Sequence, residues 1–134
     1  MLYLLDTNIC IYIIRGRQRR VVERFQQHAL SELLISSVTT AELYFGIEKS
    51  ERREHNLGVL ETFLLPIAVQ PFDYETSVLY GRLRADLERR GTPIGPLDTL
   101  IAAHALSLGA VLVTNNTREF ERIPELRLEN WATS

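Results

Sequence analysis

The sequence has 134 residues, of which 46% are hydrophobic and 24% are charged. This length predicts one domain, residues 1–134, that buries most of its apolar surface, and the composition excludes a disordered or low-complexity chain. The formal net charge of −2 excludes a protein that holds nucleic acid through a uniformly basic surface.

Cysteine content and hydropathy indicate the cellular compartment in which the protein is expected. Cys10 is the only cysteine, which excludes an internal disulfide framework and a cysteine-based zinc site and agrees with a reducing cytoplasm. We interpret it as a small buried apolar residue. The longest apolar stretch, residues 9–14, is far below the ~20 residues of a membrane-spanning helix. No basic segment precedes it, so we expect neither a membrane segment nor a signal peptide, and a cytoplasmic protein.

Short apolar runs alternate with helical periodicity along the chain. The runs predict strands at residues 2–5, 33–36, 68–70, 111–114 and, by the weakest pattern, 126–128. The periodicity predicts helices at about residues 6–15, 19–28, 38–50, 54–65, 73–90 and 96–109, with Pro66 and Gly109 marking two of the ends. Continuously apolar strands between helices are typical of a parallel sheet covered on both faces. The sequence therefore predicts an α/β protein with three layers.

Asp6 follows the first apolar run directly, at the point where a helix begins. Side chains at the carboxyl ends of parallel strands face the crevice in which open α/β sheets bind their ligands. Asp6 is therefore a candidate functional acid. A plain helix N-cap is the structural alternative.

Two further acids stand at predicted helix starts. Glu42 follows the second strand, although its spacing from Thr39 also fits a capping box. Asp98 follows Pro96, where an acid in the first turn complements the helix dipole. The chain order brings both acids to the same edge of the sheet as Asp6. Three carboxylates in one crevice repel one another unless a cation lies between them.

The chemistry of these side chains indicates which cation. No cluster of His or Cys accompanies the carboxylates, so the oxygen ligands favour Mg²⁺ or Mn²⁺ over zinc. Carboxylate-held Mg²⁺ accepts phosphate oxygens, and such ions activate water for the hydrolysis of phosphodiesters. Fourteen of the fifteen basic residues are arginine, whose guanidinium binds phosphate oxygens bidentately. Arginines at the edge of the crevice are therefore expected to position the substrate.

A fourth position of the site follows the strand at residues 111–114. Asn116 offers only a neutral oxygen or a hydrogen bond, whereas Glu119, one turn later, offers a charge. The structural alternative is a capping Asn and a surface Glu, and the sequence leaves the choice open. His104 lies on an apolar helical stripe, and we interpret it as a structural histidine.

Four segments in order make the chain resemble the PIN-domain ribonucleases, and within them the VapC toxins of type II toxin–antitoxin modules. The segments are residues 4–8 (LLDTN), 37–43 (SVTTAEL), 94–105 (IGPLDTLIAAHA) and 112–120 (LVTNNTREF). They extend from the first residues almost to the last. The resemblance implies a PIN-like fold with a parallel five-stranded sheet and RNA cleavage that depends on Mg²⁺ or Mn²⁺.

The resemblance also assigns roles to single residues. Asp6, Glu42 and Asp98 match the acidic catalytic positions, and we expect Asp6 and Asp98 to anchor the metal. Thr7 and Thr114 would bind water or substrate beside them. The family often has Asp in place of Asn116, and commonly a polar residue at the position before the third acid, which is leucine here.

The family resemblance also implies protein partners. The family typically forms homodimers and is silenced by an antitoxin whose C-terminal segment covers the active site. An apolar surface for this contact is offered by Ile11, Ile14, Tyr44 and Phe45, with core packing as the alternative use of at least half of it.

The sequence thus predicts a toxin endoribonuclease. The enzymatic alternative is a phosphatase with Asp6 as nucleophile, which would require an acid at Asn8 and a well-placed lysine, and Lys49 is the only lysine. The alternative from another class is a receiver-like module that acts only by protein contact. The presence of three acids at separate predicted strand ends and helix starts disfavours it.

Overall fold

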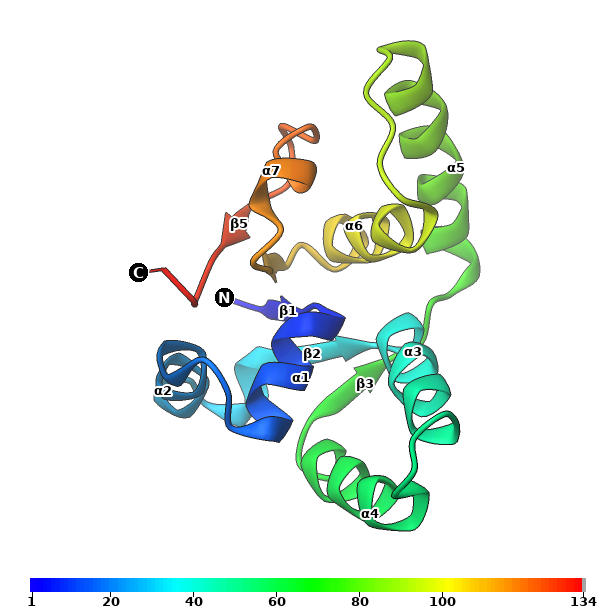
Figure 1. The fold of residues 1–134 in the computed structure, drawn as a ribbon. Coiled ribbons are helices and arrows are strands. Elements are labelled where there is room, and N and C mark those ends of the chain that lie inside the picture. Colours follow the sequence, from blue (N-terminus) through cyan, green and yellow to red (C-terminus); the bar gives the residue numbers. More distant parts are fainter. Residues whose placement is uncertain (134) are drawn as a thin grey trace.

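The computed structural model describes residues 1–133 and shows a parallel sheet between two layers of helices (Figure 1). In chain order the elements are β1 (Tyr3–Leu5), α1 (Thr7–Arg15), α2 (Arg19–Gln27), the 3₁₀ turn η1 (Leu30–Glu32), β2 (Leu33–Ser36), α3 (Ser37–Glu48), α4 (Arg53–Leu64), β3 (Ala68–Gln70), α5 (Tyr74–Arg89), α6 (Pro96–Leu108), β4 (Val111–Val113), α7 (Thr117–Phe120) and β5 (Leu128–Glu129).

The sheet has the strand order β3-β2-β1-β4-β5, and every neighbouring pair is parallel. The first strand of the chain is therefore the central one. The chain builds β2 and β3 on one side of β1 and then returns to build β4 and β5 on the other. A parallel sheet binds its ligands where the strand order reverses, which here is the carboxyl edge between β1 and β4.

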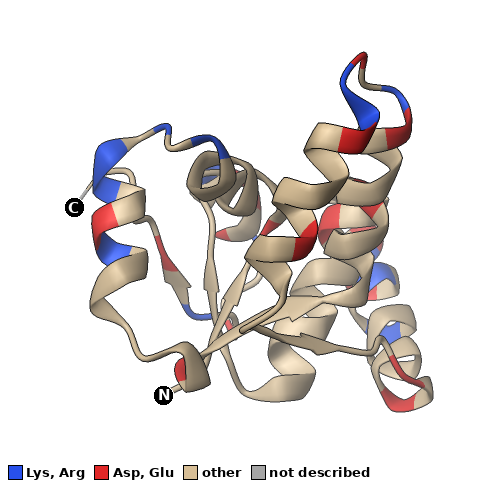
Figure 2. Ribbon diagram, turned by 90° about the horizontal axis from the view of Figure 1, so that it is seen from below, with Lys and Arg blue, Asp and Glu red and all other residues tan. Residues whose placement is uncertain are grey.

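Each face of the sheet has its own core because successive strand residues point to opposite faces. Leu4 and Leu112 pack with α5, α6 and α7, whereas Leu5 and Val113 pack with α1, α2, α3 and α4. No charged residue occurs in β1 to β4. Lys, Arg, Asp and Glu lie mainly on the helices and turns around the sheet (Figure 2). The predicted three-layer α/β fold is confirmed.

The helix ends follow local sequence signals. Gly16 and Gly109 adopt left-handed backbone with φ of 64° and 63° and cap the C-termini of α1 and α6, a conformation that costs glycine no steric penalty. Helix α4 ends at Leu64, two residues before Pro66, which has no backbone N–H with which to continue the helix. The predicted helix ends lie within two residues of the observed ones.

The prediction that Cys10 is a buried apolar residue is also confirmed. Cys10 is fully buried, and burial raises the pKa of its thiol well above the usual range, so the thiol is inert at neutral pH. Trp131 is fully buried and stacks on His28, with ring centroids 5.1 Å apart. Within residues 1–133, no helix combines the length and the apolar character that a membrane crossing requires.

Candidate active site

Asp6 is fixed at the carboxyl edge of the sheet by its own backbone and side chain. Its N–H donates to the carbonyl of Val113 on β4 at 3.1 Å, and its Oδ1 accepts from the N–H of Ile9 at 2.9 Å. The residue is therefore the N-cap of α1, as the structural alternative in the sequence analysis predicted. It is 8% exposed. The cap takes up one carboxylate oxygen and leaves the other for a ligand.

Glu42 reaches the same edge from α3. The capping-box interpretation is wrong, because the helix begins earlier than the spacing suggested: Ser36 is the N-cap and accepts from the N–H of Val38 at 3.0 Å. Thr39 is buried within the first turns. The Glu42 Oε1 accepts instead from the hydroxyl of Thr7, at 2.8 Å. Glu42 thus faces the residue that follows Asp6.

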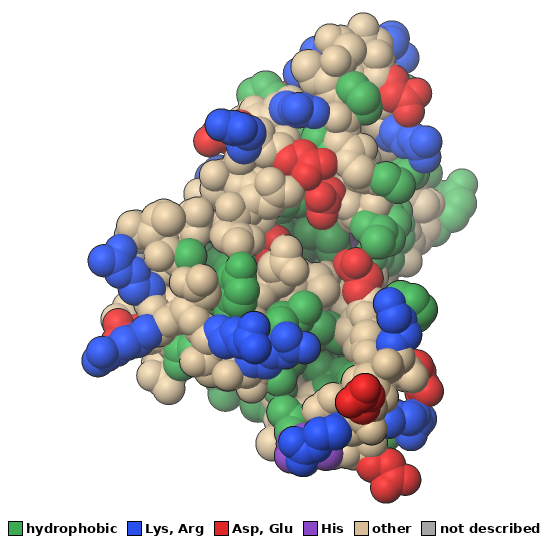
Figure 3. Space-filling view, in the orientation of Figure 1, with side chains coloured by type: hydrophobic (Ala, Val, Ile, Leu, Met, Phe, Trp, Pro, Cys, Tyr) green, Lys and Arg blue, Asp and Glu red, His purple; other side chains and the backbone are tan. Residues whose placement is uncertain are grey.

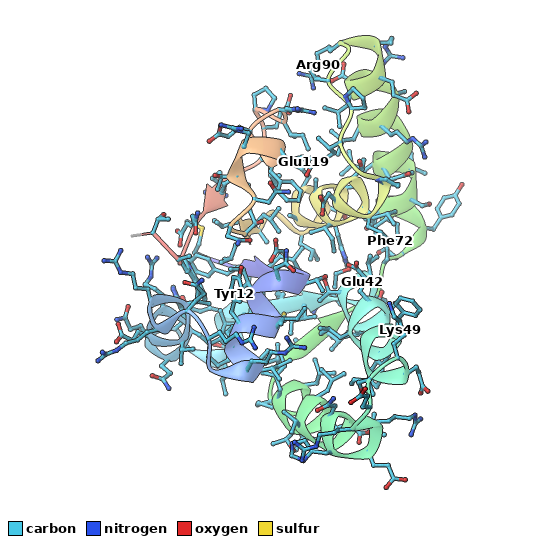
Figure 4. All side chains as sticks on the ribbon, viewed as in Figure 1. Tyr12, Glu42, Lys49, Phe72, Arg90 and Glu119 are labelled. Atoms are coloured by element: carbon cyan, nitrogen blue, oxygen red, sulfur yellow. The ribbon has the colours of Figure 1, made fainter. Side chains whose placement is uncertain are left out.

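Asp98 completes the acidic set from the first turn of α6, which has Pro96 at its start. The charges of Asp6 and Glu42 both act on it. Three separate elements therefore bring the three predicted acids together. Figure 3 shows acidic side chains around a hollow on this face of the molecule, and Figure 4 labels Glu42 on α3 and Glu119 on α7, on opposite sides of that hollow.

The electrostatics of the site are those of crowded, partly dehydrated carboxylates. Burial raises the pKa of Asp6 to about 6, and the charge of Glu42 adds to the effect, while a hydrogen bond from the Thr114 hydroxyl opposes it. Burial also raises the pKa of Asp98 to about 7, with further contributions from Glu119, Asp6 and Glu42. Raised pKa values in a cleft are typical of functional acids.

Glu119, one of the two candidates for the fourth position, contacts the other candidate, Asn116, and the start of α6. Its Oε1 accepts from the N–H of Gly95 at 2.8 Å, and its Oε2 accepts from the amide of Asn116 at 2.6 Å. The Asp98 carboxyl donates a hydrogen bond to it. The Gly95 hydrogen bond is the main cause that lowers the pKa of Glu119. Glu119 therefore faces Asp98, whereas Asn116 directs its N–H₂ group to Glu119.

This arrangement predicts different effects for two alanine variants. Asn116→Ala removes one hydrogen bond, worth about 1 kcal/mol, and should lower RNA cleavage less than about tenfold. Glu119→Ala should lower it more, because it removes a charge beside Asp98 and releases Gly95 at the start of α6. Rates measured side by side on one RNA substrate check the order. The reverse order would show that Asn116 is the fourth functional residue.

Thr114 and His104 make hydrogen bonds to residues that position the acids. Thr114 is fully buried, donates to Asp6 and accepts from the N–H of Asn116 at 3.0 Å. The Nδ1 of His104 lies 2.8 Å from the Oγ of Ser36, the residue that caps α3. Burial lowers the pKa of His104, which keeps its imidazole neutral. The predicted structural role of His104 agrees with these contacts.

The carboxylate oxygens of these acids are suitable ligands for a hard divalent cation. Within residues 1–133, no three His, Cys, Asp or Glu side chains lie close enough to enclose an ion. Mg²⁺ does not require such a cage, since it keeps several waters and binds through one or two carboxylates. Asp6 and Asp98 supply two, both on helix N-terminal turns. The negative charge of Asp98 and Glu119, which lie within hydrogen-bond contact, calls for a cation at this place.

The matching family model is that of the PIN domain, over residues 3–126. The chain therefore belongs to the PIN-domain family. Its relatives within that family are VapC proteins. It is 47% identical over 129 residues to the tRNA(fMet)-specific endonuclease VapC of Salmonella typhimurium, covering 96% of this chain and 97% of the relative.

Solved structures agree with this assignment. The VapBC complex of Salmonella typhimurium bound to DNA contains a chain that is 48% identical, with a TM-score of 0.91, over 98% of this chain and 99% of that one. The VapBC2 complex of Rickettsia felis, bound to a fragment of its promoter DNA, contains a chain that is 41% identical, with a TM-score of 0.90 and the same coverage. The VapC group predicted from the four segments is confirmed.

Proposed function

We propose that this protein is the toxin of a toxin–antitoxin pair and that it is an endoribonuclease that hydrolyses RNA phosphodiester bonds. The observation that carries the proposal is the meeting of Asp6, Glu42 and Asp98 from α1, α3 and α6 at the point where the strand order reverses. Their separate local roles do not explain why two of them have raised pKa values. The names of the VapC relatives support the substrate class.

The residues take the following roles in this proposal. Asp6 and Asp98 hold Mg²⁺ or Mn²⁺, which, when bound, supplies Lewis-acid activation of water and of the phosphate. Glu42, held by Thr7 at 2.8 Å, accepts a proton or orients the attacking water. Thr114 donates a hydrogen bond to the Asp6 carboxylate. Glu119 keeps the start of α6, and with it Asp98, against the site.

A cognate antitoxin is the proposed protein partner, since the related chains were solved as VapBC complexes. A groove of about 350 Å³ between α1, α3 and α4 provides a surface for it. Ile11 and Ile14 line the groove, as predicted, with Arg15 and His55 beside them. Glu42 also lines it, so a segment in this groove reaches the active site. The proposal includes the homodimer expected from the family resemblance.

The test is cleavage of purified tRNA by the antitoxin-free protein. The name of the Salmonella relative makes initiator tRNA the first substrate, with elongator methionine tRNA as its matched control. We expect cleavage in Mg²⁺ or Mn²⁺, loss of cleavage in EDTA and recovery when the ion is restored in excess. Cleavage that persists in EDTA after dialysis would contradict the metal mechanism. The absence of cleavage in any RNA from total cellular extract would contradict the function.

The structure disfavours the two alternatives. A phosphatase would need Lys49 beside Asp6, but Lys49 caps the far end of α3 and lies over the ring of Phe45. Residue 8, where that chemistry requires an acid, is asparagine. A module that acts only through protein contact gains nothing from acids whose burial and mutual repulsion destabilise the fold.

A further inference from the structure

An apolar hollow adjoins the acidic site. Its volume is about 740 Å³, and Thr7 and Glu42 form one part of its lining. The rest includes apolar side chains from α1, α3 and the start of α6, namely Ile11, Val38, Phe45 and Leu97. The hollow is therefore continuous with the acidic site, but its lining is mainly apolar. A ligand that fills both must combine a charged group with a flat or apolar one.

Two of the apolar side chains are exposed without serving either core. Phe45 is 64% exposed and Leu97 is 48% exposed. Each is linked to an acid of the site: Phe45 follows Glu42 by three positions on α3, which places both on one face of the helix, and Leu97 directly precedes Asp98. Exposed large apolar residues that gather beside a polar site indicate a binding surface.

A positive charge lies over the phenyl ring of Phe45. The Nζ of Lys49 is 5.0 Å from the centroid of the Phe45 ring, within the range of a cation–π contact. Lys49 is four positions further along α3, one turn more distant from the acids. An aromatic ring with a neighbouring cation is the combination that proteins use to bind single-stranded nucleic acid, by stacking on a base and attracting a phosphate.

We propose that Phe45 and Leu97 form a nucleobase subsite for the substrate RNA. One unpaired base stacks on Phe45 and contacts Leu97, while the phosphodiester next to it lies at Asp6 and Asp98 and a further phosphate faces Lys49. This inference rests on the proposed function and adds a requirement to it: the base must leave any helical stack. RNA is therefore cut in loops or single strands, not within a duplex.

An apolar side chain of a protein partner fits this hollow less well. The Thr7 hydroxyl already donates to the Glu42 carboxylate at 2.8 Å, but an apolar side chain would cover that carboxylate without bringing it a further donor, which is costly for a buried charged group. It would also make no use of Lys49. A nucleotide meets both requirements, because its ribose carries hydroxyl donors and its phosphates carry a negative charge for Lys49.

Cleavage rates of matched variants provide the first test. Phe45→Ala should lower kcat/KM on the preferred RNA roughly tenfold, as expected for the loss of one stacked base, and Phe45→Trp should keep it close to the wild-type value. Leu65→Ala is the control, since Leu65 is 87% exposed at the end of α4 and lies outside the hollow. Circular dichroism establishes that the variants are folded.

A base-deletion series identifies the stacked nucleotide. RNA oligonucleotides that span the mapped cleavage site carry an abasic ribose at successive positions. In the wild type, one position should reduce kcat/KM roughly tenfold, and in Phe45→Ala the same position should have no further effect. A reduction that is equal in both proteins at every position would overturn the proposal.

Binding without catalysis gives an independent readout. In EDTA, the indole fluorescence of the Phe45→Trp variant should be quenched by the intact oligonucleotide and not by the one that lacks the identified base. The controls separate the possible failures. If the wild type cuts no RNA, the proposed function fails and the subsite with it. If Phe45→Ala cuts normally and only loses affinity for a protein inhibitor, the proposed function stands and the subsite is wrong.

Discussion

Replacement of Asp6 or Asp98 with asparagine lowers RNA cleavage on the order of 10³-fold or more, the size expected when one member of a cooperating catalytic set is removed. Asparagine preserves the shape of each side chain, and at position 6 it preserves an oxygen for the N–H of Ile9. Only the negative charge is lost. A neutral amide cannot balance a divalent cation, so the expected loss falls mainly on kcat and is not overcome by saturating substrate.

Asp73→Asn is the matched control for this experiment. Asp73 also caps a helix after a strand, with its Oδ1 accepting from the N–H of Thr76 at 2.9 Å, but it is not among the charges that act on Asp6 or Asp98. Its variant should cleave RNA at the wild-type rate. Retained cleavage in Asp6→Asn and Asp98→Asn, with the same products as the wild type, would remove both residues from the mechanism.

The second large effect is a gain in folding stability. We expect Asp6→Asn to raise the free energy of unfolding of the metal-free protein by about 3 kcal/mol at pH 7.5. Burial raises the pKa of Asp6 from 3.8 to about 6, and each unit corresponds to about 1.4 kcal/mol of preference for the neutral form. At pH 7.5 the folded wild type carries this ionised carboxylate at a cost that the unfolded chain does not have. The amide has no such cost.

The pH dependence follows from the same shift. A carboxyl group with a raised folded pKa keeps its proton longer in the folded than in the unfolded state, so folding stability falls as pH rises through the window from about 4 to 6. Above that window the penalty is constant, and below it the penalty is absent. The stability difference between Asp6→Asn and the wild type should therefore grow from near zero below pH 4 to its full value near pH 7.

Urea unfolding in EDTA at a series of pH values measures this difference. Asp73→Asn is again informative, because burial does not raise the pKa of Asp73; its hydrogen bonds with Thr76 lower it. That variant should not gain stability with rising pH. Equal unfolding midpoints of Asp6→Asn and the wild type across the whole range would show that the burial of Asp6 carries no electrostatic cost, and its place among the functional acids would lose its main physical support.

Hydrophobic pattern and helix-end signals predicted most of the fold. Four of the five strands were found from runs of apolar residues, since strands buried on both faces are apolar throughout. Helix α7 was missed because its four residues are too few to show a period, and β5 was shifted by two residues because it lies at an edge and has only partly buried residues. Short elements of this kind are specified by their neighbours and not by their own sequence.

Candidate acids were predictable where they follow a strand or begin a helix, whereas contacts between residues distant in sequence were not. Asp6, Glu42 and Asp98 were identified as candidates in this way. Glu119 was identified as an alternative to Asn116, but its hydrogen bond with Gly95, 24 positions away, was not predictable. The capping-box interpretation of Glu42 was wrong for a related reason. Ser36 and Thr39 are both acceptable N-caps by residue type, and the helix begins after Ser36 because β2 ends there.

The central position of β1 determines when the site can exist during synthesis. Asp6 is made almost at once, but its strand lies between β2 and β4, its backbone N–H donates to the carbonyl of Val113 and its carboxylate accepts from Thr114. Asp98 and Glu119 are also translated late. A growing chain therefore contains Asp6 and Glu42 for much of its translation without the third acid, Asp98. The ribosome that makes this protein is not exposed to an assembled nuclease until the last segment of the chain has been added.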